Sequence, residues 1–179
     1  DSRLVLDWSS DVCSSDLKIE AVTVDVGGGG ALTGGDGDTL GRLIVDVPTS
    51  GLTTTVAPDA VVSSQGTVAV GTHVPLTYTN MVAGENLQID GTAGSDTVRY
   101  LGTGGSDAFV VSPNGTLAAV ALTIDGTVVR HGVDLNVDGA QAIETLTINA
   151  GDDGDTVTVN HSHGVASVNV IGGAGTSTD

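Results

Sequence analysis

The chain has 179 residues, of which 22 are acidic and five are basic, and its formal net charge is −17. So acidic a chain repels phosphate groups, which excludes nucleic acid and anionic membrane surfaces and favours divalent cations as partners. Glycine accounts for 27 residues and aromatic residues for only 2%, so valine, isoleucine, leucine and alanine must form any core, and strands joined by turns are expected in place of helices.

The first 17 residues differ in kind from the rest of the chain. Residues 7–17 read D-W-S-S-D-V-C-S-S-D-L and contain the only tryptophan and the only cysteine. This string resembles the translation of a common DNA-sequencing adapter at all eleven positions, and it has neither the basic segment nor the apolar run of a signal peptide. We therefore interpret residues 1–17 as an adapter-derived artefact, which we expect to be disordered.

Residues 18–179 are expected to form a single all-β repeat region, a fragment truncated at both ends. The adapter-derived residues carry four of the acidic residues and one of the basic ones, so the remaining net charge is −14. No cysteine remains, which excludes disulfides and thiolate zinc sites. No run of 18 apolar residues occurs, so no membrane-spanning helix is expected.

The repeat region opens with a strand-like segment and a glycine-rich turn. The string E-A-V-T-V begins at Glu20, and the glycine-rich sequence after it leads to Asp36 and Asp38. Residues 47–72 are the least repeat-like part of the chain, and we interpret them as a linker or as an inserted set of strands.

Two later segments show the repeat most clearly. E-N-L-Q-I-D-G-T-A-G-S-D-T-V starts at residue 85 and E-T-L-T-I-N-A-G-D-D-G-D-T-V starts at residue 144, a shift of 59 residues without a gap. The alignment pairs Leu87 with Leu146 and Asp96 with Asp155. The segment from Glu20 is a third and looser copy.

A shorter unit recurs inside and between these copies, with two alternating apolar residues followed by Asp or Asn and then Gly or Ala. It begins at Leu87, Leu122, Leu135 and Leu146, with a relative at Val168. Alternating apolar residues bounded by Asp-Gly predict a short strand that buries one face and ends in a turn. Strands that follow one another about every 10 to 15 residues are typical of all-β folds.

Two all-β topologies fit this pattern. In a right-handed parallel β-solenoid or β-roll-like repeat, each strand stacks on its equivalent one coil away, and the Gly/Asp turns stack beside it. In an antiparallel β-sandwich, Asp-Gly pairs occupy tight hairpins, and A-L-T-I-D-G-T-V-V-R at residues 121–130 is such a hairpin signal. We expect the solenoid, with this hairpin projecting from it, and the sandwich is the alternative.

Two of the turns carry a recognisable motif, G-T-A-G-S-D-T-V-R at residues 91–99 and G-T-G-G-S-D-A-F-V at residues 102–110. They resemble the calcium-binding nonapeptide G-G-x-G-x-D-x-U-x of RTX, or haemolysin-type, proteins, with U a large apolar residue, and differ from it at the second glycine. Asp96 and Asp107 are 11 residues apart, so the layout is closest to the degenerate repeats of large bacterial surface proteins. The resemblance implies a parallel β-roll that holds Ca²⁺ in its turns, in a secreted or cell-surface bacterial protein.

The carboxylates of these turns are the candidate metal ligands, because Ca²⁺ prefers six to eight oxygen atoms. In order of clustering, they are Asp152, Asp153 and Asp155, then Asp36 and Asp38, and then Asp96 and Asp107. The alternative is that these are structural turns without an ion, in which each Asp side chain accepts hydrogen bonds from the backbone of its own turn.

Other chemistry has weaker support in the sequence. His161 and His163 would share one face of a strand, but an exposed polar face is the simpler interpretation. Glu85 and Glu144 are equivalent positions of the repeat rather than an acid/base pair. Basic and aromatic residues are scarce, and no nucleophile elbow or phosphate-binding loop occurs, so we do not expect an enzyme or any catalytic residue.

The sequence therefore predicts a non-catalytic repeat segment, structural or adhesive, that Ca²⁺ in the Gly/Asp turns stiffens. The alternatives are an ion-free β-repeat spacer and a non-catalytic flank of a secreted enzyme. The expected partners are neighbouring repeats of the same chain and a surface glycan or protein ligand.

Overall fold

The computed structural model describes residues 22–25, 42–62, 64–79, 86–115, 117–124, 128–129, 132–137 and 139–173. The adapter-like residues 1–17 and the candidate ligands Asp36 and Asp38 lie outside the described residues, so what the sequence indicates about them stays a prediction. The described residues form fourteen β-strands and one short 3-10 turn, η1 (Gly139–Gln141), with no α-helix among them. The all-β prediction is confirmed.

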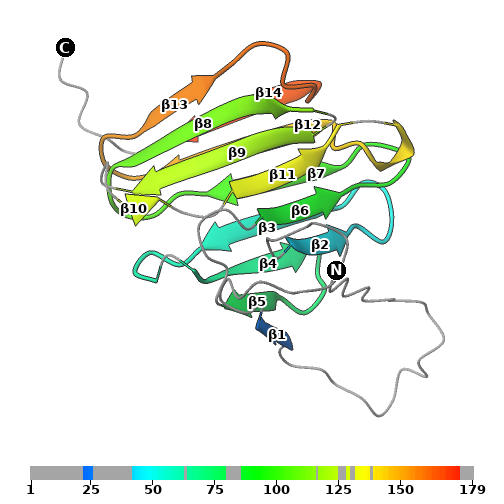
Figure 1. Cartoon of the computed structure of the whole chain (residues 1–179), viewed down its shortest axis with the longest axis horizontal. Coiled ribbons are helices and arrows are strands. Elements are labelled where there is room, and N and C mark those ends of the chain that lie inside the picture. The colour runs from blue at the N-terminus through cyan, green and yellow to red at the C-terminus, as the bar shows by residue number, and fades with distance from the viewer. Residues whose placement is uncertain are drawn as a thin grey trace, which may run out of the picture.

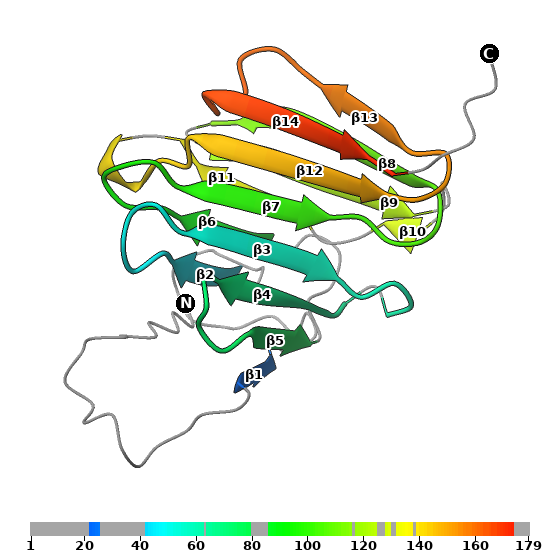
Figure 2. The ribbon, with the colours of Figure 1, turned by 180° about the vertical axis from the view of Figure 1, so that it is seen from behind.

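The described strands belong to two open sheets that face each other. Sheet A has the order β1-β5-β4-β3-β7-β12-β14 and lies in front in Figure 2, whereas sheet B has the order β13-β8-β9-β11-β6-β2, with β10 beside β9, and lies in front in Figure 1. Sheet A consists of β1 (Val22–Asp25), β3 (Thr53–Pro58), β4 (Gly66–Val70), β5 (Leu76–Thr79), β7 (Thr97–Leu101), β12 (Thr145–Gly151) and β14 (Ser167–Gly172). Sheet B consists of β2 (Arg42–Asp46), β6 (Asn86–Asp90), β8 (Asp107–Asn114), β9 (Leu117–Ile124), β10 (Val128–Val129), β11 (Gly132–Asn136) and β13 (Thr156–Val159).

The chain passes repeatedly from one sheet to the other, and the strands of successive passes are parallel. It runs from β6 in sheet B to β7 in sheet A and β8 in sheet B, and later from β12 in sheet A to β13 in sheet B and β14 in sheet A. In sheet A, β7 lies parallel to β3, β12 to β7 and β14 to β12, and in sheet B β6 lies parallel to β2 and β13 to β8. Two antiparallel meanders, β3-β4-β5 and β8-β9-β11, interrupt these passes. Both sheets are therefore mixed, and neither a wholly parallel solenoid nor a wholly antiparallel sandwich describes them.

Two local predictions have clear outcomes. The hairpin predicted at residues 121–130 is present as the antiparallel pair of β9 and β10, in which Val128 lies opposite Ile124 and Val129 opposite Thr123. Residues 47–72 contain β3 and β4, so of the two interpretations it is the inserted set of strands that the structure supports.

The stacking offset differs from the offset of the sequence repeat. Thr145 of β12 pairs with Thr97 of β7, and this offset of 48 residues recurs in the hydrogen bond between Glu144 and Asp96. Leu87, which the sequence repeat pairs with Leu146, belongs to β6 in the opposite sheet. The repeat at residues 85 and 144 therefore marks strands with the same local conformation in different sheets, and these strands are not neighbours.

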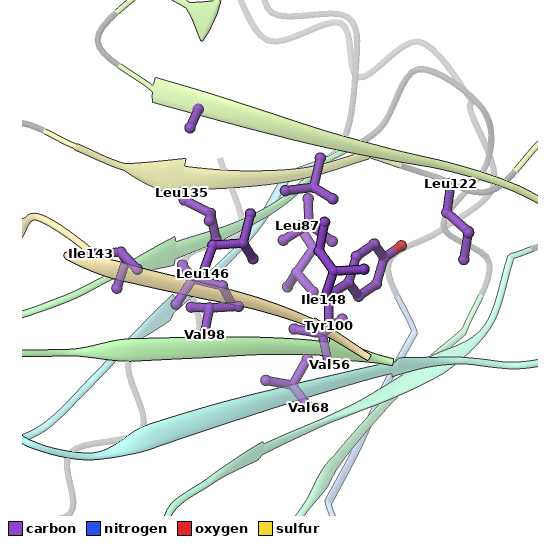
Figure 3. Packing of buried hydrophobic residues seen from close by; sticks show 14 of the residues in the cluster. Val56, Val68, Leu87, Val98, Tyr100, Leu122, Leu135, Ile143, Leu146 and Ile148 are labelled. Carbon is purple, nitrogen blue, oxygen red and sulfur yellow. The ribbon is translucent and has the colours of Figure 1, made fainter. Parts of the chain in front are cut away.

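The hydrophobic core lies between the two sheets, where both contribute alternate residues (Figure 3). In β12 every second residue is buried, as its apolar alternation predicts. Tyr78, Tyr100 and Phe109 are the three aromatic residues after residue 17, and all are among the largest fully buried side chains. The rings of Tyr100 in sheet A and Phe109 in sheet B meet edge to face with 5.8 Å between their centroids, so they join the two layers.

Candidate functional site: the Gly-Asp turns

The motif-bearing turns are the connections at which the chain crosses between the sheets. The first Gly-Asp turn (residues 91–96) joins β6 to β7, the second (residues 102–107) joins β7 to the start of β8, and the third (residues 151–155) joins β12 to β13. Their side chains therefore lie at the rim of the two layers, close to the ends of the core strands. What the aspartates contact there decides whether the turns need an ion.

Asp96 closes the first turn by accepting hydrogen bonds from its backbone. Its Oδ2 accepts the N–H of Thr92 at 2.7 Å and the hydroxyl of Thr92 at 3.0 Å, and its Oδ1 accepts the N–H of Gly51 at 3.0 Å. Only 1% of Asp96 is exposed. A buried carboxylate is tolerated when hydrogen-bond donors surround it, and here three donors do so.

Asp107 closes the second turn in the same way. Its Oδ2 accepts the N–H of Thr103 at 2.6 Å, and the Thr103 hydroxyl lies 3.1 Å from Oδ1. The same hydroxyl accepts the N–H of Gly105 at 3.2 Å, so the threonine contacts both the middle of the turn and its last residue. Asp107 is 2% exposed. The two turns thus share one construction, in which the aspartate bonds the threonine four residues before it.

Acidic side chains also connect each turn to the adjacent pass of the chain. Glu144 Oε2 accepts the N–H of Asp96 at 2.7 Å, and Asp155 Oδ1 accepts the N–H of Asp107 at 2.9 Å. Both pairs are 48 residues apart, which is the offset of the parallel strands beside them. Side-chain bonding and strand register therefore reinforce one another, since both join the same two passes.

The glycine that precedes each of these threonines permits the close approach of the passes. A Cβ on Gly102 would lie 2.2 Å from the carbonyl oxygen of Ala150 and 2.6 Å from Asp107 Oδ2, and a Cβ on Gly91 would lie 2.5 Å from the carbonyl oxygen of Ala142. Distances this short exclude a side chain unless the backbone moves. The first glycine of each motif copy, Gly91 and Gly102, is therefore explained by packing between passes, without reference to an ion.

The third turn is more open and does not repeat this construction in full. Asp152 and Asp153 are exposed, and Asp153 has a φ of 81°, in the left-handed region that Asp tolerates better than most residues. Asp155 is half-buried and bonds the N–H of Asp107. Within the described part of the chain, no group of three or more His, Cys, Asp or Glu side chains is arranged to hold a metal ion.

The histidine prediction needs a correction. His161 and His163 follow β13 in the connection to β14, so they are not on a strand and do not share a strand face. His163 Nδ1 accepts the N–H of Val165 at 3.2 Å. This hydrogen bond is local and gives His163 a structural role in the connection.

Sequence reasoning missed the role of the two threonines, and it noted Glu144 only as a repeat position and not as a contact of Asp96. Thr92 and Thr103 occupy the same place in the two copies of G-T-x-G-S-D, four residues before the aspartate, and that shared spacing was a usable signal. Glu144 could not be found in this way, because its partner Asp96 comes from a different pass of the chain.

A second polar cluster lies on the face of sheet B that points away from the core. Gln88 and Asp90 alternate with core residues of β6, and Gln88 Nε2 donates to Asp90 Oδ1 at 2.6 Å. Asp46 is the register partner of Asp90 on β2, and Asp134 on β11 accepts a hydrogen bond from Asn114 Nδ2 at 3.2 Å. Asp90 and Asp134 are buried. The turns are thus not the only place where carboxylates are withdrawn from solvent.

Comparison with models of protein families, with curated proteins and with solved structures found no match to this chain. Among the described residues, no helix has the length and apolar character needed to cross a membrane. The contacts of the turns are therefore the basis for a functional proposal.

Proposed function

We propose that this chain is a non-catalytic structural repeat segment, or spacer, of a secreted or cell-surface bacterial protein, and that its Gly-Asp turns hold their shape without an ion. The observation that carries the proposal is the matched pair of buried carboxylates. The carboxylates of Asp96 and Asp107 each accept a hydrogen bond from the threonine of their own turn. The backbone N–H of each aspartate donates to an acidic side chain 48 residues later in the chain. The N–H and O–H donors around Asp96 and Asp107 then satisfy these carboxylates, as Ca²⁺ does in RTX-type turns.

The proposal includes a solenoid-like architecture in which the two antiparallel meanders are inserted into the sheets. It is supported by the alternation of the chain between the sheets and by the parallel pairing of strands from successive passes. A crossover connection between two parallel strands of one sheet is almost always right-handed. In this arrangement neighbouring repeats of the same chain are the natural partners, because each pass buries its apolar residues against the next.

The chemistry of the donors argues against calcium at Asp96 and Asp107. A hydrogen bond from an N–H to a charged acceptor contributes about 1.5–3 kcal/mol, and a bound cation would have to displace such bonds in order to reach the same oxygens. The N–H groups of Thr92 and Thr103 would then point at a positive ion. Asp152 and Asp153 are exposed, so they are the carboxylates that a Ca²⁺ ion could reach directly from solvent.

The test is a pair of thermal melts of the chain by circular dichroism, in millimolar Ca²⁺ and in EDTA. We expect the same Tm in both buffers. A site that binds only the folded chain would add about 2.7 kcal/mol at a hundredfold excess over Kd, which is a rise of roughly 5–11 °C for a chain of this size. Such a rise would overturn the ion-free proposal.

A matched variant locates any calcium effect. The double variant Asp152→Asn and Asp153→Asn removes the exposed carboxylates but leaves the buried ones in place. If Ca²⁺ raises the Tm of the parent chain and not of this variant, the ion binds the third turn. If the rise persists, the ion binds at other carboxylates, which are the buried aspartates or the sequence candidates Asp36 and Asp38, and the same melts of D107N distinguish these two cases.

A further inference from the structure

The two sheets end at β13 and β14 with core-facing side chains exposed. Val159 of β13 is the register partner of Val111, and Val170 of β14 is the register partner of Ile148. Val111 and Ile148 are fully buried, at 0% exposure, whereas Val159 is 41% exposed and Val170 is 51% exposed. The core positions of this last described pass therefore have the side chains of an interior, and no other described strand covers them.

The described edge strands at this end have neither the charged residues nor the proline that commonly prevent pairing with another strand. Proteins block exposed edges with charged residues or proline. The sequences of β13 and β14 are TVTV and SVNVIG, with no charge and no proline. At the other end of the sheets, β1 is VTVD and β2 is RLIVD, and both carry charged residues. Figures 1 and 2 show β13 and β14 together at one end of the molecule and β1 at the other.

We propose that the end formed by β13 and β14 is an interface for a second copy of this chain, which docks with its own β13-β14 end. Within the chain, β14 lies beside β12 with Val168 and Val170 in register with core residues, and β13 lies beside β8 with Val157 and Val159 in register with core residues. A second copy offers the same valines and the same strand edges, which no described strand pairs. A two-fold axis brings the β14 edges together as an antiparallel pair, which is the closed arrangement that self-complementary edges form.

The charge distribution favours this partner and this end. Two chains with a net charge of −17 repel each other, and uncharged edges allow the closest approach at the smallest electrostatic cost. The opposite end presents charged edge strands, so joining head to tail would bring an uncharged edge against a charged one. Because screening weakens the long-range repulsion, association through β13 and β14 is expected to strengthen with salt.

This interface goes beyond the proposed function, since it concerns contact between two chains rather than the role of the turns within one. Its test is independent of calcium. If the chain self-associates and also binds Ca²⁺, the interface proposal stands and the ion-free proposal fails. If the chain stays monomeric and binds no Ca²⁺, only the interface proposal fails.

The experiment is sedimentation velocity of the 179-residue chain over a hundredfold range of concentration, at low and at high salt. We expect the mass to rise from 17.6 kDa to that of a dimer and to stop there, with the midpoint at lower protein concentration in high salt. A monomer at every concentration overturns the proposal. Growth to open-ended polymers also overturns it, because that result requires two different ends to meet.

Matched substitutions assign the surface. Val170→Lys and Val159→Lys place a charge on the exposed core positions, and we expect each to raise the dimer dissociation constant at least tenfold. Val61→Lys is the control, because Val61 is 87% exposed in the connection between β3 and β4, away from this end. Circular dichroism verifies that all three variants fold. Equal weakening by Val61→Lys and Val170→Lys would overturn the assignment of the interface to β13 and β14.

Discussion

Replacing Asp107 with asparagine probes the central contact of the Gly-Asp turns. The substitution preserves size and one oxygen but turns the other oxygen into an NH₂ donor. In the parent chain both oxygens accept, because Oδ2 is 2.6 Å from the N–H of Thr103 and Oδ1 is 3.1 Å from its hydroxyl. The variant can present an acceptor at only one of these positions, so the Thr103 hydroxyl is left with at most its longer contact of 3.3 Å to the remaining oxygen, and the charge is lost from both bonds.

The size of the effect follows from burial and charge. Asp107 is 2% exposed, so water cannot replace the lost acceptor. A hydrogen bond to a charged group contributes about 1.5–3 kcal/mol, and a buried donor without an acceptor costs about 1–3 kcal/mol. We expect D107N to lower the free energy of unfolding by about 3 kcal/mol, which corresponds to a fall in Tm of roughly 6–12 °C for a chain of this size.

The assay is urea denaturation followed by circular dichroism, in Ca²⁺ and in EDTA. Asp153→Asn is the matched control, because Asp153 is exposed and asparagine also tolerates its left-handed backbone. We expect this control to change the free energy of unfolding by less than about 0.5 kcal/mol. The reasoning is refuted if D107N and D153N have the same effect, or if the loss in D107N occurs only when Ca²⁺ is present.

Three further substitutions, the first with a matched control, test the packing around the turns and in the core. Gly102→Ala places a Cβ 2.2 Å from a carbonyl oxygen of β12, and we expect a loss of about 2–4 kcal/mol, whereas Gly104→Ala meets nothing within 4 Å and should change stability by less than about 0.5 kcal/mol. Thr54→Val should raise the free energy of unfolding by about 1 kcal/mol, because the Thr54 hydroxyl is buried without a partner among the described residues; an unchanged or lower urea midpoint would contradict this. Glu144→Ala removes the acceptor of the Asp96 N–H at 2.7 Å and should cost about 1–3 kcal/mol in the same denaturation assay, with a loss below 0.5 kcal/mol counting against the contact between passes.

Local pattern predicted the strands well, and it did so for a physical reason. The unit that starts at Leu87 alternates apolar and polar residues, and side chains on a strand alternate between its two faces, so Leu87 and Ile89 were expected on one buried face. Both are fully buried in β6. The hairpin at residues 121–130 was also predictable, because Asp-Gly between two apolar runs is a local turn signal.

The candidate site was predictable only in part. The importance of Asp96 and Asp107 followed from the motif, but the motif alone could not distinguish an ion from a hydrogen-bond donor as the partner of each carboxylate. The donors are the threonine of the same turn and, for Asp96, Gly51 from an earlier pass. A bond from Gly51 depends on the stacking of β3 against β7, which no local signal contains.

The sequence by itself determined which segments are strands, which of their faces are buried and where the turns lie, because backbone geometry and side-chain polarity act over a few neighbouring residues. Only the tertiary structure decided which strands are neighbours. Leu87 and Leu146 have the same local surroundings in the sequence but belong to opposite sheets, and Asp155 lies beside Asp107 rather than beside Asp96, its counterpart in the repeat. The reason is that the meanders between the repeats change the number of residues per pass, so the register depends on the path of the whole chain and not on the repeated motif.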